Sequence, residues 1–154
     1  MNKTSQISVQ NAQRKLRVDL KALRQFASRA LGRCTRVAPP RAGELKKLGA
    51  VRIVLVSDAR MAALHKTFMN IASPTDVLTF QHGEIFISVE TAAQNAARFR
   101  TTMDREIRLY LVHGLLHLAG FDDTSAAQAR EMSSLQRRIV AASGAEAAAR
   151  GGPV

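Results

Sequence analysis

The sequence predicts an α+β protein in which a small four-stranded mixed sheet packs against helices. Three observations favour this class: short apolar runs alternate with segments of helical periodicity, two of those runs carry a hairpin signal, and the length suits one domain. Of the 154 residues, 46% are apolar, so a sizeable core can form without metal or disulfide staples. We therefore expect a single domain over residues 1–154.

The first half of the chain supplies two of the expected strands and two helices. Ile7–Gln10 is a weak strand candidate, and apolar residues at helical spacing predict a helix from Val18 to about Leu31. The apolar run 52–56 predicts a buried strand, and Ser57-Asp58 after it are suitable N-cap residues. The helix that they begin, 59–68, is expected to bury Met61, Leu64 and Phe68.

The second half supplies a hairpin and three further helices. The runs 77–80 and 84–87 are separated by Gln81-His82-Gly83, a hairpin signal. Ser88 is expected to cap a helix to about Phe99, and Thr101-x-x-Asp104 resembles a capping box that opens a helix reaching Gly120. A last helix is expected from about Ser125 to Ala142, with Met132, Leu135 and Ile139 in the core. The Ala- and Gly-rich tail, about 144–154, is expected to fray.

Positive charge is concentrated in the first third of the chain. Residues 1–49 carry 12 basic and 2 acidic side chains, whereas residues 50–154 carry 11 basic and 10 acidic ones. A basic segment beside a nearly neutral body favours a polyanionic partner of the nucleic-acid class over charge that serves only solubility. The candidate nucleic-acid-binding residues are Arg14, Lys15, Arg17, Lys21 and Arg24.

The composition argues against a secreted protein, a disulfide-built protein and a membrane-spanning protein. The single Cys34 cannot form an internal disulfide, which favours a reducing, cytoplasmic compartment and no disulfide-linked partner. No apolar run approaches the ~20 residues of a membrane span, and the first eight residues lack the apolar core of a signal peptide.

The strongest chemical signal lies in residues 113–123, His-Gly-Leu-Leu-His-Leu-Ala-Gly-Phe-Asp-Asp. His113 and His117 share one helix face, where two imidazoles can bind one ion. Gly120 suits the left-handed residue that ends a helix, so Asp122 or Asp123 can return beside the histidines. Two histidines and one carboxylate leave a position open for water, which is typical of catalytic zinc. Histidines with a purely structural role are the alternative.

The same segment argues against a zinc protease. An H-E-x-x-H protease uses a glutamate after the first histidine as its general base. Gly114 occupies that position and cannot transfer a proton. A metalloprotease is disfavoured, although a metzincin-like helix and turn around the metal is expected to be shared.

These residues carry a resemblance to a known family. The histidine motif is similar to the signature of the YbeY family, metal-dependent endoribonucleases of bacterial rRNA maturation. Residues 74–80, Pro-Thr-Asp-Val-Leu-Thr-Phe, are similar to that family's P-T-D-V-L-S-F segment, and residues 83–88 to its G-D-I-x-I-S. Glu106 and Glu131-Met132 also match, so the resemblance covers about residues 50–140.

The resemblance implies an α+β fold with one Zn²⁺ per chain and action on single-stranded RNA. It implies a role in maturing the 3′ end of the small-subunit rRNA and in ribosome quality control, with the small subunit and its assembly proteins as partners. His113, His117 and Asp123 are the implied ligands, and a metal-activated water is the expected nucleophile. Glu106 is either a partner that orients a ligand or an exposed acid near a helix start.

Three positions depart from the family pattern; one of them is His65, which stands where the pattern has asparagine. Asp123 stands where the third ligand is normally histidine; zinc accepts a carboxylate, but the anion lowers the charge of the centre. Met69 stands at the place of the usual arginine, and Lys66, one helical turn away, is the candidate substitute for binding phosphate. The alternative function is therefore a non-catalytic RNA- or ribosome-binding assembly factor with a structural metal. Aromatic residues make up only 5% of the chain, so no stacking platform for bases is expected.

Overall fold

The computed structural model describes residues 6–41, 43–71 and 73–150, with side chains given as far as Gly144. Over these residues the chain forms one four-stranded sheet, five α-helices and a short 3-10 helix. The predicted α+β class with a small mixed sheet is confirmed.

The sheet has the strand order β1-β2-β4-β3. Strands β1 (Gln6–Asn11), β2 (Ala50–Val56) and β4 (Glu84–Ser88) run parallel to one another. Strand β3 (Val77–Phe80) pairs antiparallel with β4 through the predicted hairpin and forms one edge of the sheet. This open edge borders the candidate functional site described below.

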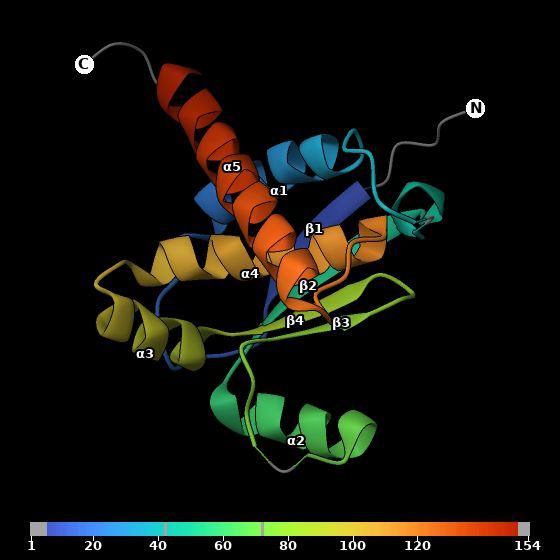
Figure 1. Ribbon diagram of the computed structural model, residues 1–154. Coiled ribbons are helices and arrows are strands. Elements are labelled where there is room, and N and C mark those ends of the chain that lie inside the picture. Colours follow the sequence, from blue (N-terminus) through green and yellow to red (C-terminus); the bar gives the residue numbers. More distant parts are fainter. Residues whose placement is uncertain (1–5, 42, 72, 151–154) are drawn as a thin grey trace.

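Helices cover both faces of the sheet unequally. Helices α1 (Leu20–Cys34), α4 (Met103–Ala119) and α5 (Ala126–Arg150) lie over one face, and α3 (Val89–Phe99) packs beside α4 (Figure 1). The main core lies between this layer and the sheet, where alternate residues of the strands, such as Ile53 and Ile85, are fully buried. Apolar burial of this kind is the principal source of stability, so this layer fixes the position of α4.

Helix α2 (Asp58–Met69) covers the opposite face of the sheet (Figure 1). Met61 packs there against Val54 and Val56 in a smaller apolar cluster. The start of α2 is tied to the start of α3, because the Asp58 carboxylate accepts a hydrogen bond of 2.6 Å from Thr91 Oγ1 and its N–H donates to Glu90. Ser57 is the N-cap residue, as expected.

Phe68 corrects the prediction of a third core residue on α2. Met61 and Leu64 are buried, but the side chain of Phe68 is 59% exposed. The two buried residues lie where α2 crosses the sheet, whereas Phe68 belongs to its last turn and meets the edge strand through Phe80. Helical spacing places a residue on a face and cannot tell how far along the helix the sheet extends.

Two helix boundaries and one additional turn are the main further differences from the predictions. Thr102, not Thr101, caps α4, and its hydroxyl accepts from the N–H of Arg105, so no capping box forms with Asp104. Helix α5 continues to Arg150 rather than ending near Ala142, so the tail is helical as far as the described residues reach. The last four residues of that expected tail lie outside the described part. A 3-10 turn, Leu45–Lys47, had no clear signal in the sequence.

The structure also describes the single cysteine and shows whether any helix could span a membrane. Cys34 is a buried free thiol at the end of α1, and burial raises its pKa to about 12, as expected of an unreactive cysteine. Among the described helices, none has both the length and the apolar character needed to cross a bilayer.

Candidate metal centre

Helix α4 lies directly on the sheet because Gly114 has no side chain. A Cβ atom built there would lie 2.8 and 2.9 Å from two carbons of Ile85 and 3.0 Å from Thr79 Oγ1. Gly114 is thus the contact point between helix and sheet, and a larger residue would force the two apart. This contact places the neighbouring His113, and His117 one turn later, beside the edge strand β3.

The three predicted ligands come together. His113 Nε2 and His117 Nε2 are 3.1 Å apart, and Asp123 Oδ2 lies 3.6 Å from each. Donor atoms ~2.0–2.2 Å from one tetrahedral ion are ~3.3–3.5 Å apart, so these separations fit a single zinc-type site. One ligand atom from each residue lies within 4.8 Å of the others. The donor set therefore fits the implied metal ion.

Hydrogen bonds fix both imidazoles in the form that binds metal. His113 Nδ1 lies 3.0 Å from Gln136 Oε1, and His117 Nδ1 lies 3.1 Å from the carbonyl oxygen of Phe121. Both partners are acceptors, so each Nδ1 carries the proton and each Nε2 keeps its lone pair for an ion. Burial lowers the pKa of His113, which also favours the neutral, ligating ring.

Gln136 was not found by sequence reasoning. It lies on α5, which crosses α4, and its role depends on that packing. One signal was available: Gln136 stands four residues after Met132 and three before Ile139, on the buried stripe of α5. A polar residue at such a position needs a hydrogen-bond partner.

The turn after α4 returns Asp123 to the histidines. Gly120 has φ 114°, and a Cβ atom there would lie 2.2 Å from the backbone oxygen of Arg41. The left-handed conformation and the close approach both require glycine. Asp122 points elsewhere and pairs with Arg41 at 3.5 Å.

The centre opens into a groove beside the edge strand. A cavity of about 330 Å³ is lined by both histidines, Met69 of α2 and residues 77–81 of the hairpin. The Asp123 side chain is 39% exposed and the histidines about a quarter, so water and a substrate can reach the ligand atoms. Lys66 does not line the groove, and its ammonium group donates to Asn70 Oδ1 at 3.0 Å.

Glu106 is neither an exposed acid nor a partner of the ligands. Its side chain is buried, and its carboxylate accepts a hydrogen bond from the hydroxyl of Tyr110, which in turn accepts from Asn95 at 2.7 Å. Burial raises the pKa of Tyr110 to about 12. This network joins α4 to α3, two turns before His113.

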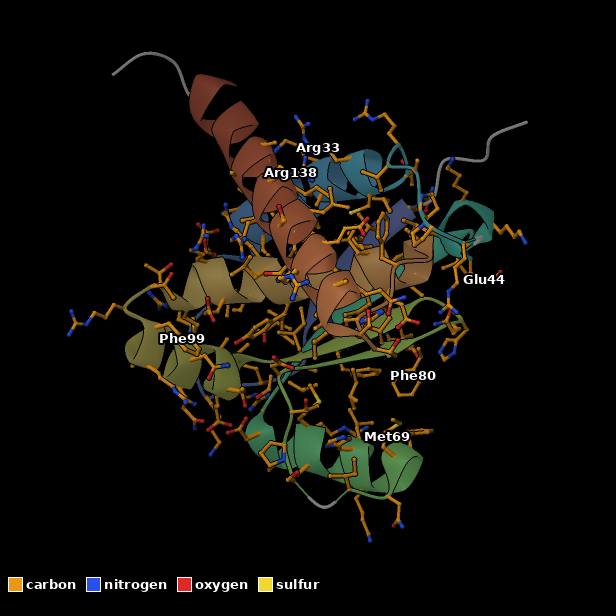
Figure 2. The ribbon with its side chains drawn as sticks, viewed as in Figure 1. Arg33, Glu44, Met69, Phe80, Phe99 and Arg138 are labelled. Atoms are coloured by element: carbon orange, nitrogen blue, oxygen red, sulfur yellow. The ribbon has the colours of Figure 1, made fainter. Side chains whose placement is uncertain are left out.

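Of the candidate nucleic-acid-binding residues, Arg17 lies toward the other end of α4. Arg17 shares a cavity with Asp104 and Ile107, ~15 Å along the helix from His117. Arg14, Lys15, Arg17, Lys21 and Arg24 are all exposed, and the guanidinium group of Arg24 also donates to the backbone oxygen of Val9. Another basic cavity, of about 260 Å³ between α1 and α5, is lined by three arginines that the sequence did not single out: Arg36, and the Arg33 and Arg138 labelled in Figure 2.

Removing the Gln136 amide is expected to weaken metal binding by about 10- to 100-fold, because His113 loses the acceptor that orients it. Gln136→Ala should show this loss in a titration with Zn²⁺ against a competing chelator. Gln136→Glu, which keeps an oxygen acceptor, should retain the affinity of the wild type. Equal affinities for all three proteins would show that Gln136 does not orient the ligand.

An α+β fold that presents two histidines from one helix and a carboxylate from the turn after it has the form of a metal-dependent hydrolase. The family model "Endoribonuclease YbeY" matches residues 8–144 of the chain. The chain therefore belongs to the YbeY family of endoribonucleases.

Individual relatives agree with this assignment. An "Endoribonuclease YbeY" of Acholeplasma laidlawii is 33% identical over 105 residues, covering 63% of this chain and 77% of the relative. An "Endoribonuclease YbeY" of Anaeromyxobacter sp. is 36% identical over 115 residues, covering 67% of this chain and 60% of the relative. The solution structure of TM1509 from Thermotoga maritima superposes with a TM-score of 0.64 and 25% identity, over 94% of this chain and 93% of that one.

Proposed function

We propose that this protein is a zinc-dependent endoribonuclease, specific for single-stranded RNA, that acts in rRNA maturation at the 3′ end of the small subunit and in ribosome quality control. The proposal places it in the cytoplasm, with ribosomal RNA, the small subunit and its assembly proteins as partners. It rests on the family, whose relatives bear the name endoribonuclease, and on the chemistry of the candidate centre.

One observation supports the catalytic form of the proposal above others. Both Nε2 atoms and Asp123 Oδ2 converge within 3.6 Å, each imidazole is oriented by an oxygen acceptor, and the groove leaves the ligand atoms accessible. Structural zinc is usually enclosed by four protein ligands. A centre with three ligands beside a groove is the arrangement expected for hydrolysis.

In the proposed nuclease, separate residues would bind the metal, orient its ligands and seat the RNA strand. His113, His117 and Asp123 would hold the ion, which when bound supplies Lewis-acid activation of water and neutralises charge on the attacked phosphate. Gln136 and the Phe121 carbonyl keep the two rings in place. The groove beside β3 would seat the strand with one phosphate at the centre. Gly114, at the place of a protease's general base, contributes packing only.

Met69 favours a second candidate, a non-catalytic assembly factor with a structural metal. It lines the groove at the position where the family pattern has arginine, and a thioether cannot pair with phosphate. Both candidates bind RNA, and they differ in whether the metal is needed for cleavage.

Removal and restoration of the metal separates the two candidates. We expect the purified protein to cut a single-stranded fragment of ribosomal RNA, to stop when a chelator removes the ion, and to resume when Zn²⁺ is added. A matched duplex should remain intact. RNA binding without cleavage by the protein carrying one Zn²⁺ per chain would favour the assembly factor.

RNA binding is expected to weaken steeply with salt and to depend on the exposed basic residues of the first third. Arg14→Glu, Lys15→Glu and Lys21→Glu together should lower affinity and reduce the salt slope by about one for each phosphate that the protein no longer binds. Arg24 is left unchanged because it binds a backbone oxygen. Metal content should stay the same. Affinity that is insensitive both to salt and to these changes would show that the charge serves only solubility.

A further inference from the structure

An apolar surface stands at the C-terminal end of α2, next to the candidate metal centre. Phe68 is 59% exposed, Met69 57% and Ile71 46%; they are three of the four large hydrophobic side chains exposed in the described part of the chain. Large apolar side chains gathered at one exposed place commonly mark a binding site. We call Phe68, Met69 and Phe80 together the aromatic surface.

Phe80 of the edge strand contacts three other rings beside this surface. Its ring meets the edge of Phe68 at 5.2 Å between centroids and Phe86 at 5.7 Å, both T-shaped, and it stacks with His82 at 5.8 Å. Side chains fixed before binding lose little entropy when a ligand arrives. The composition predicted no stacking platform, but the fold collects three of the chain's six phenylalanines here.

The aromatic surface is continuous with the candidate metal centre. Met69 and Phe80 line the same cavity as His113 and His117, and Figure 2 shows Met69 and Phe80 facing the space between α2 and β3. A volume of about 330 Å³ lies at the small end of the range for ligand pockets. A group bound on the surface would therefore adjoin a phosphate held at the centre.

The open edge of β3 adds polar groups to the apolar ones. The backbone oxygens of Asp76 and Phe80 accept hydrogen bonds from Ser88 and Gly83, on the side of β4. Main-chain groups alternate in direction along an antiparallel strand, so the N–H and C=O of Thr79 point to the open edge, where the cavity lies. A donor and an acceptor beside an aromatic face match a nucleobase, which has a π-face and a polar edge.

We propose that the aromatic surface binds one nucleobase of the RNA strand, adjacent to the phosphate at the candidate metal centre. This inference rests on the proposed function and adds a base-binding subsite to it. This subsite gives Met69 a function of its own. Where the family pattern has an arginine that can bind phosphate, Met69 supplies an apolar contact for a base. The net charge of +11 suits a polyanionic strand better than a cationic or neutral apolar partner.

The test combines a change in the protein with a change in the RNA. Fluorescence anisotropy measures the affinity of the full chain, kept in chelator so that the strand survives, for a short single-stranded RNA. Phe68→Ala with Met69→Ala should lower affinity about tenfold, the effect of losing one stacked base. Both side chains are exposed, so the fold should tolerate the change. Phe99→Ala, equally exposed at 61% but on α3, is the matched control and should bind like the wild type.

Oligonucleotides with a single abasic position identify the ligand as a base. One abasic position should cost the wild type about tenfold and cost the double variant nothing more. Equal losses at every position in both proteins, or an unchanged affinity of the double variant, would overturn the base-binding subsite. In that case a protein segment is the remaining occupant for an apolar surface. If the wild type binds no RNA, the proposed function itself fails, so the two failures are distinct.

Discussion

Replacing His117 with alanine is expected to remove bound metal and RNA cleavage together. The variant loses one of three ligand atoms and also the ring that links the centre to the Phe121 carbonyl. Loss of a partner that merely orients a ligand costs about 10- to 100-fold in metal affinity, so loss of the ligand should exceed about 100-fold. Elemental analysis and cleavage of single-stranded RNA measure the two effects on the same preparation.

His65→Ala is the matched control for that experiment. His65 lies on α2 and its ring bonds to the backbone oxygen of Ser73, outside the candidate centre. It should keep one ion per chain and cleave at the wild-type rate. Cleavage that persists in metal-free His117→Ala would place the activity elsewhere or in a contaminating nuclease.

Gly120→Ala is expected to give the largest loss of stability. A Cβ atom at this position would lie 2.2 Å from the Arg41 backbone oxygen, and the residue has φ 114°. Overpacking against backbone and the left-handed conformation together should cost about 3 kcal/mol of unfolding free energy. Urea denaturation in the presence of chelator measures this cost without a contribution from the metal.

A second glycine provides the comparison. Gly32 lies inside α1, where a Cβ atom would meet Arg36 Nη2 at an ordinary 3.5 Å. Gly32→Ala should therefore stabilise the protein by about 0.5–1 kcal/mol through helix propensity. If Gly120→Ala proved as stable as Gly32→Ala, the turn after α4 would not need glycine. Metal content measured on folded Gly120→Ala shows in addition whether the turn positions Asp123.

Gly114 separates this centre from that of a zinc protease for a packing reason. The residue after the first histidine faces the sheet here, 2.8 Å from Ile85 for a built Cβ, so a glutamate could not occupy it without moving α4. The absence of a general base at this position is thus a consequence of how closely helix and sheet approach. In the proposed nuclease, activation of the nucleophile would therefore come from groups on the other side of the groove or from the ion.

Local sequence information was enough to predict the fold class, most of the helices and strands, and two histidine ligands with an acid at position 122 or 123; the choice of Asp123 came from the family resemblance. The local predictions depend on apolar periodicity, cap residues such as Ser57 and Ser88, and the spacing of His113, His117 and the acid after Gly120. The side chains of one helix and the turn after it have nearly fixed relative positions, so their meeting can be predicted without tertiary structure.

The groups that surround those ligands depend on how distant elements pack together. Gln136 reaches His113 because α5 crosses α4, and Phe68 is exposed because α2 extends to the edge of the sheet. Phe68, Phe80 and Phe86 come from three elements and meet beside the histidines, although composition suggested no aromatic platform. Contacts between residues distant in the chain depend on how the elements pack, and a periodicity records which face is apolar but not what that face meets.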